Sequence, residues 1–177
     1  MTSTWVLGDI HGCAEELGEL LDGLALGPDD RLISVGDLYH RGPDPVGVVD
    51  LVVVVVKCYD TEDAVRSALP TIGEDTVVLS LQNGWGNAAR IASVVGEGHT
   101  AVGVTYHSAT VMAPGRIHHT GVGRTVVGEL DGSVSERMTR IAAALNGAGL
   151  ETEATGHVSQ EIWAKLAMNV CALPTAA

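Results

Sequence analysis

Apolar residues along this chain fall into short runs and into longer stretches with helical spacing. The short runs predict strands at Thr4–Leu7, Arg31–Val35, Asp50–Val56, Thr76–Leu81, Ala101–Tyr106, Arg116–Thr120, Thr125–Leu130 and Glu151–Thr155. The helical spacing predicts helices at Ala14–Leu24, Thr61–Leu69, Asn87–Val95, Ser133–Asn146 and Val158–Cys171. Strands that alternate with helices are typical of an α/β fold with a mostly parallel sheet. Because the run Asp50–Val56 is apolar after its first residue, we expect that strand to be buried on both faces.

Length, composition and charge narrow the classes of protein to consider. The 177 residues suffice for one domain, or for a domain with a fragment of a second. Ten Lys and Arg against 22 Asp and Glu give a net charge of −12, which argues against nucleic acid and anionic membranes as partners. The longest unbroken apolar run, Leu51–Val56, is far shorter than the about 20 residues that cross a bilayer, so we expect no membrane segment. Three cysteines without a Cys-x-x-Cys pair predict buried, reduced thiols and a cytoplasmic location: Cys13, Cys58 and Cys171.

Two acids and a histidine directly follow the first two predicted strands. Asp9 and His11 lie in Gly-Asp-Ile-His-Gly after the first strand, and Asp37 begins Asp-Leu-Tyr-His-Arg after the second. The carboxyl ends of parallel strands are where α/β proteins bind ligands, and these side chains suit Mn, Fe or Zn. Residues 4–46 resemble the calcineurin-like metallophosphoesterases in these motifs.

This first resemblance implies a divalent metal pair. Asp9 and His11 would bind one metal, Asp37 would bridge the two, and Arg41 would hold a substrate phosphate. His40 stands where that family has an acid, and the family's later metal-binding blocks are absent, so three ligands remain for two metals. We therefore interpret these residues as strand-end and turn residues without metal, and keep metal-dependent phosphoester hydrolysis as an alternative function.

The only two lysines of the chain suggest a different chemistry. Lys57 follows the apolar run at Asp50–Val56, and Lys165 lies in the middle of the last predicted helix. Apolar surroundings lower the pKa of a lysine, which then donates a proton more readily, as ketone reduction requires. Asn169 shares a helix face with Lys165 because it lies four residues later. Asn83 lies in a Gln-Asn-Gly turn after a predicted strand.

The segments that carry these lysines and asparagines occur in an order that resembles another family. They include Asp-Leu-Val-Val-Val-Val-Val-Lys, Leu-Ser-Leu-Gln-Asn-Gly and Trp-Ala-Lys-Leu-Ala-Met-Asn, within residues 50–177. These segments are similar to ketopantoate reductases, that is, 2-dehydropantoate 2-reductases. The resemblance implies a small-molecule substrate and NADPH-dependent reduction of 2-dehydropantoate to pantoate. Lys165 would then be the proton donor, and Lys57, Asn83 and Asn169 would bind substrate or cofactor.

The two resemblances together predict a chimeric chain. Residues 1–49 would be metallophosphoesterase-like, residues 50–157 a Rossmann-like nucleotide-binding part, and residues 158–177 the first helix of a truncated helical domain. Because the Gly-x-Gly-x-x-Gly loop of dinucleotide-binding proteins is missing and the chain is short, we expect impaired or no reductase activity. A non-catalytic remnant or interaction module is the third hypothesis, and the oligomeric state stays open.

Overall fold

The computed structural model describes residues 4–7, 19, 31–34, 49–113 and 116–172. Its strands are β1 (Thr4–Leu7), β2 (Arg31–Ser34), β3 (Val49–Val54), β4 (Ile72–Ser80), β5 (Thr100–Thr105), β6 (Ser108–Ala113), β7 (Arg116–Gly121), β8 (Thr125–Glu129) and β9 (Thr152–Ala154). Its α-helices are α2 (Thr61–Ala68), α3 (Asn87–Val95), α4 (Glu136–Gly147) and α5 (Val158–Ala172). Short 3-10 turns lie at Cys58–Asp60, Leu69–Thr71 and Glu97–His99.

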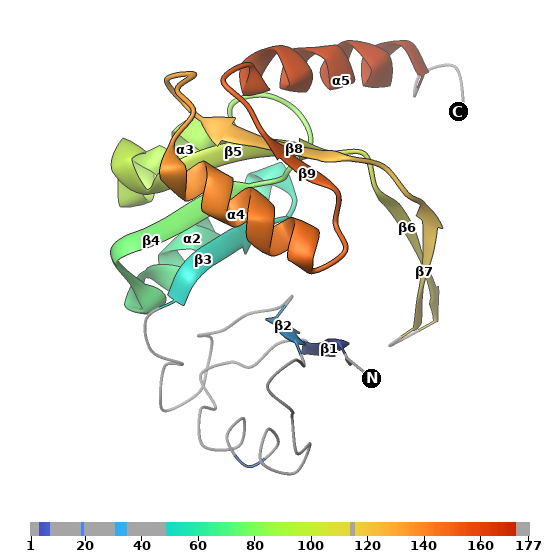
Figure 1. Ribbon diagram of the computed structural model, residues 1–177, viewed down its shortest axis with the longest axis horizontal. Helices are drawn as coiled ribbons and strands as arrows, with labels where there is room; N and C mark the ends of the chain where they lie inside the picture. The colour runs from blue at the N-terminus through green and yellow to red at the C-terminus, as the bar shows by residue number, and fades with distance from the viewer. Residues whose placement is uncertain (1–3, 8–18, 20–30, 35–48, 114–115, 173–177) are drawn as a thin grey trace.

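A mixed but mostly parallel sheet forms the centre of the molecule (Figure 1). Its five strands lie in the order β3-β4-β5-β8-β9, and only the β5–β8 pair is antiparallel. Strands β1 and β2 form a separate parallel pair, and β6 and β7 form an antiparallel arm that extends from the body. The α/β class with a mostly parallel sheet and flanking helices is thereby confirmed.

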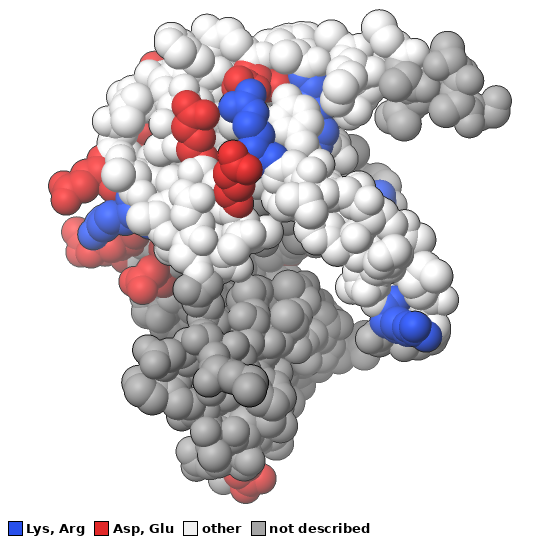
Figure 2. Space-filling view, turned by 45° about the vertical axis from the view of Figure 1, so that its right-hand side comes forward, with Lys and Arg blue, Asp and Glu red and all other residues white. Residues whose placement is uncertain are grey.

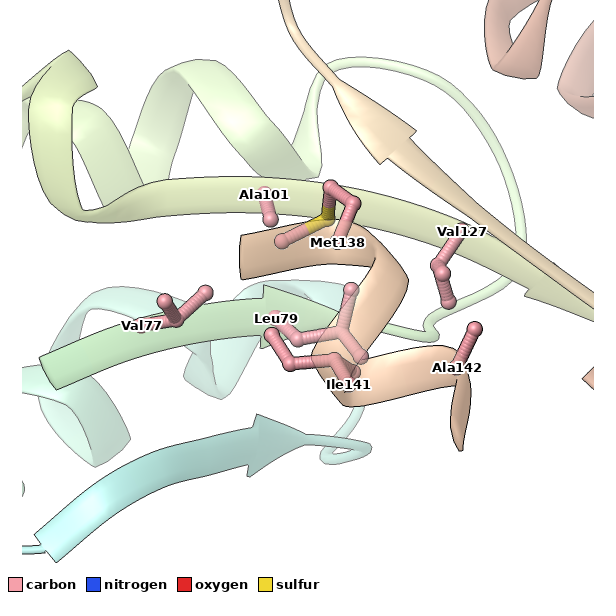
Figure 3. Packing of buried hydrophobic residues seen from close by; sticks show 7 residues of the cluster. All are labelled: Val77, Leu79, Ala101, Val127, Met138, Ile141 and Ala142. Carbon is pink, nitrogen blue, oxygen red and sulfur yellow. The ribbon is translucent and has the colours of Figure 1, made fainter. Parts of the chain in front are cut away.

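Side chains that alternate along the strands form a separate apolar layer on each face of the sheet. Figure 3 shows the first layer, in which Leu79 and Val127 pack against Met138 and Ile141 of α4. On the other face, Val78 packs against Val65 of α2 and Ile91 of α3. The two-residue period of β4 explains why adjacent Val78 and Leu79 serve opposite layers.

Local signals in the sequence account for the helix boundaries. The hydroxyl of Ser135 accepts a hydrogen bond from the backbone N–H of Met138, which caps the start of α4. Helix α3 ends at Gly96, whose positive φ of 86° is a backbone conformation that favours glycine. The expected helices from Thr61 onward are therefore confirmed within a few residues. The expected helix Ala14–Leu24 lies outside the described residues, apart from Glu19.

Three expectations about burial are wrong. Strand β3 lies at the edge of the described five-stranded sheet, so Asp50 and Val53 are exposed and the strand is not buried on both faces. Lys57, just beyond that strand, is exposed for the same reason. The described cysteines, Cys58 and Cys171, are exposed rather than buried. A run of apolar residues does not specify how many strands and helices pack around a strand, because these come from distant parts of the chain.

Charged side chains are scattered over the described surface in Figure 2. On this face, acidic and basic groups lie apart from one another in several places, and much of the described surface between them is uncharged. Among the described residues, no helix is both long enough and apolar enough to cross a membrane.

Helix α5 approaches β8 closely because position 128 is a glycine. A Cβ atom at Gly128 would lie 2.5 Å from the carbonyl oxygen of Thr155 and 2.8 Å from Cβ of Val158. We expect Gly128→Ala to lower the free energy of unfolding by about 1–3 kcal/mol, because the start of α5 must move away from the sheet. Gly98→Ala is the matched control, since a Cβ there meets nothing within 4 Å. Denaturant unfolding measures both variants, and equal stabilities would contradict the close approach.

Candidate functional site

Polar and aromatic groups gather where β3, β4 and β5 end. Lys57 follows β3, Asn83 follows β4, and Tyr106 follows β5. Because β3, β4 and β5 are parallel, these three ends lie at the same edge of the sheet. Helix α5, which carries Lys165 and Asn169, packs against β5 and β8.

Lys165 reaches the end of β5. Its Nζ donates a hydrogen bond to the carbonyl oxygen of Thr105 at 2.5 Å, and lies 5.4 Å from the ring centre of Tyr106. The ammonium group is thus held by a backbone oxygen and by an aromatic ring. Burial lowers the pKa of Lys165, since removal from water disfavours the charged form.

A hydrogen-bond network centred on Gln82 joins the segment after β3 to the end of β4. The side-chain nitrogen of Gln82 donates to the carbonyl oxygen of Val56 and to the hydroxyl of Thr61, both at 2.8 Å. The hydroxyl of Ser80 donates to the side-chain oxygen of Gln82 at 3.1 Å. Gln82 therefore fixes the segment that leads to Lys57 relative to the turn that holds Asn83.

The turn after Gln82 leads directly into helix α3. The side-chain nitrogen of buried Asn87 donates to the carbonyl oxygen of Asn83 at 3.0 Å, which closes the turn. Asn83 itself is exposed. Beside this turn lies a cavity of about 250 Å³. Its wall includes residues of β4, α3, β5 and α5, among them Ser80, Gln82, Asn87, Gly103 and Ser159.

An ion-pair network holds α5 against the sheet near the site. Arg124, just before β8, donates to both carboxylate oxygens of Glu161 at 2.8 and 2.9 Å. Its other terminal nitrogen lies 3.4 Å from a carboxylate oxygen of Glu153 in β9. Hydrogen bonding and charge from Glu161 raise the pKa of Arg124. This two-point contact anchors α5 one turn before Lys165.

The structure brings together some of the predicted residues. Lys165 and Asn169 lie four residues apart on α5 and are both half-buried, as their spacing indicated. Asn83 and Lys57 lie at the same edge of the sheet, and both are exposed. The residues proposed for metal and phosphate all fall outside the described residues: Asp9, His11, Asp37 and Arg41. Within the described part of the chain, no group of three potential metal ligands comes together.

Several residues of the site carry no signal that marks them in advance. Thr105 contributes its backbone oxygen, and any residue type could do so. Tyr106 and Gln82 gain their roles only when distant segments meet. Trp163 is 53% exposed and stacks on Trp85. The Gln-Asn-Gly sequence was the one local signal for this turn.

The sheet topology and the position of the site at its carboxyl edge define a Rossmann-like α/β protein. Solved structures support this class. A 2-dehydropantoate 2-reductase from Geobacter metallireducens superposes with a TM-score of 0.68 at 24% identity, covering 94% of this chain and 62% of that one. D-mandelate dehydrogenase in complex with NADH and anilino(oxo)acetate also has a TM-score of 0.68, at 19% identity, and covers 95% of this chain and 61% of that one.

Sequence comparison identifies the family. The model of the family "Ketopantoate reductase PanE/ApbA" matches residues 34–132. The 2-dehydropantoate 2-reductase of Halobacterium salinarum is 41% identical over 150 residues, which are 84% of this chain and 49% of that protein. The Pyrococcus horikoshii enzyme of the same name is 36% identical over 128 residues, 72% of this chain and 42% of that protein. The chain belongs to the ketopantoate reductase family and spans about half the length of these relatives.

The family match changes the expected origin of the N-terminal segment. It begins at residue 34, earlier than the predicted start near residue 50, and so includes Asp37 and Arg41. The comparisons give no support to a metallophosphoesterase segment. The division into residues 1–49, 50–157 and 158–177 stays a prediction.

Proposed function

We propose that this chain carries the proton-donor part of an NADPH-dependent reductase that converts 2-dehydropantoate to pantoate. The half-buried lysine at the carboxyl edge of the sheet is the observation that carries the proposal. Lys165 Nζ is held by Thr105 and Tyr106, and its pKa is lowered by burial. Relatives named 2-dehydropantoate 2-reductase, at 36–41% identity, support the choice of substrate.

Each proposed residue has a role that its position supports. Lys165 would donate a proton from Nζ to the oxygen of the substrate ketone as that oxygen gains negative charge. Asn169, on the same face of α5, would hold substrate oxygens through its side-chain amide. Lys57 is exposed, so its ammonium group is available to the carboxylate of the substrate or to a phosphate of the cofactor.

The described residues fit one end of a nicotinamide cofactor. NADPH, when bound, supplies a hydride to the ketone carbon. Asn83 would orient the nicotinamide amide group, because its exposed side chain lies on a turn that Asn87 and Gln82 hold in place. The cavity beside this turn is lined by small side chains of α3, which leaves room next to it. The glycine-containing segment Gly8–Gly12 lies outside the described residues.

Titration with NADPH tests this proposal directly. We expect saturable binding with a dissociation constant in the range of about 1 µM to 1 mM, followed by enhanced nicotinamide fluorescence. Any turnover of added 2-dehydropantoate should be slow, because the chain spans about half the length of its relatives, and should oxidise NADPH as pantoate forms. EDTA should change neither the fluorescence of bound NADPH nor the formation of pantoate, because the proposed reaction uses no metal ion. Absence of saturable binding, or binding that EDTA abolishes, would contradict the proposal.

A further inference from the structure

Two tryptophans from distant parts of the chain stack on each other at the surface. The ring centres of Trp85 and Trp163 lie 5.1 Å apart, with an angle of 30° between the planes. Both residues remain more than half exposed, at 56% and 53%. Stacked aromatic pairs gain energy beyond the area they bury. The pair is thus a specific contact outside the two apolar layers of the core.

The loop that carries Trp85 has a backbone suited to presenting this side chain. Gly84 and Gly86, on either side of it, both have a φ of 92°, which other residues rarely adopt. A Cβ atom at either glycine would meet nothing within 4 Å, so the glycines serve the backbone conformation rather than close packing. The loop therefore turns at two points and places Trp85 between them.

Trp163 connects this loop to the helix that carries the proposed proton donor. It lies on α5, two residues before Lys165. The other side-chain hydrogen bonds of the loop join it to elements other than α5. Asn87 of α3 donates to the carbonyl oxygen of Asn83, and Gln82 donates to the segment after β3. The tryptophan stack is the ring contact that joins the loop to α5.

We propose that the Trp85–Trp163 stack is a positioning contact that holds the Gln82–Gly86 loop against α5. It thereby sets the position of Asn83 relative to Lys165. Neither indole needs to touch a reacting atom, so both are positioning residues. The importance of the contact for binding rests on the proposed function, whereas the contact itself can be measured without any activity.

Circular dichroism and amide exchange test the contact. Two indoles at this separation couple electronically, and we expect an exciton couplet in the far-ultraviolet spectrum of the full chain. Trp163→Ala should remove the couplet and speed amide exchange at Arg90, whose N–H donates to the carbonyl oxygen of Gly86, about 3- to 10-fold, as the energy of an aromatic pair predicts. Exchange in α4 should not change. Trp163→Phe keeps an aromatic ring, so its amide exchange should stay as slow as in the unmodified chain. Trp5→Phe is the matched control, and it should leave the couplet intact.

The consequence for the site is a change in cofactor affinity. We expect the dissociation constant of NADPH to rise about 3- to 10-fold in Trp163→Ala and to recover in Trp163→Phe. Survival of the couplet in Trp163→Ala, or unchanged amide exchange at Arg90, would overturn the proposal. Faster exchange with unchanged affinity for NADPH would also overturn it, because the stack would then be a structural contact only. The unmodified chain could show the exciton couplet and slow amide exchange but bind no NADPH. In that case the proposed function fails, while the contact between the Gln82–Gly86 loop and α5 is supported.

Discussion

Replacing Lys165 by alanine is expected to lower the rate of NADPH-dependent reduction of 2-dehydropantoate by about 10²- to 10⁴-fold, the usual contribution of a positioned proton donor. The loss follows from removal of the group that Thr105 and Tyr106 hold at the carboxyl edge of the sheet. The affinity for NADPH should change little, because proton donation stabilises the transition state rather than the bound cofactor. Initial rates under saturating NADPH measure the effect.

The pH dependence of the same reaction gives an independent check. The donor must be protonated, so the rate should fall as the pH rises through the pKa of Lys165. Because burial lowers that pKa, the fall should occur at a lower pH than for a lysine in water. Gln160→Ala changes an exposed residue of the same helix, so it should alter neither the rate of reduction nor its dependence on pH. An unchanged rate of reduction in Lys165→Ala would show that Lys165 is not the proton donor.

Replacing Glu129 by glutamine is expected to lower the free energy of unfolding by about 3 kcal/mol, the lower end of the range for breaking a buried ion pair. Arg137 donates to both carboxylate oxygens of Glu129, at 2.6 and 2.5 Å, and Ser135 donates to one of them. The side chain of Glu129 is 9% exposed, whereas Arg137 is 29% exposed and stays partly hydrated. The variant leaves the guanidinium group without its anion. Denaturant unfolding at neutral pH measures the loss.

The contribution of Glu129 to the free energy of unfolding should also depend on pH. Hydrogen bonds from Arg137 lower the pKa of Glu129 in the folded protein. A carboxyl whose folded pKa lies below its unfolded value stabilises the fold above the unfolded pKa, and this stability disappears as the pH falls through the folded pKa. The unmodified chain should therefore lose stability more steeply below about pH 4 than Glu129→Gln. Exposed Glu151→Gln is the control, and equal acid sensitivity of the chain and Glu129→Gln would contradict the role of this pair.

Local patterns predicted the helices well because their signals lie within a few residues. Helix α4 shows an apolar stripe with Met138 and Ile141, which predicted it, although its start follows the Ser135 cap rather than the expected Ser133. Strand β6 (Ser108–Ala113) was not predicted. All of its residues are exposed in the arm that it forms with β7, so burial imposes no pattern on them.

Burial of individual side chains was harder to infer than secondary structure. The apolar run at β3 suggested a central strand, but the strand received a described neighbour on one side only. The tryptophan on α5, Trp163, is exposed, and its partner is an exposed tryptophan from the loop after β4. In both cases the deciding neighbour lies far away in the sequence.

The sequence alone determined most of the strands, the helices from Thr61 onward, the α/β class, the shared helix face of Lys165 and Asn169, and the resemblance to ketopantoate reductases. Tertiary structure decided that β3 lies at the edge of the described five-stranded sheet, that Lys165 binds the end of β5, and that Trp85 meets Trp163. The physical reason is the range of each effect. Helix periodicity and capping act over a few residues, whereas burial, pKa shifts and hydrogen-bond partners depend on segments that only folding brings together.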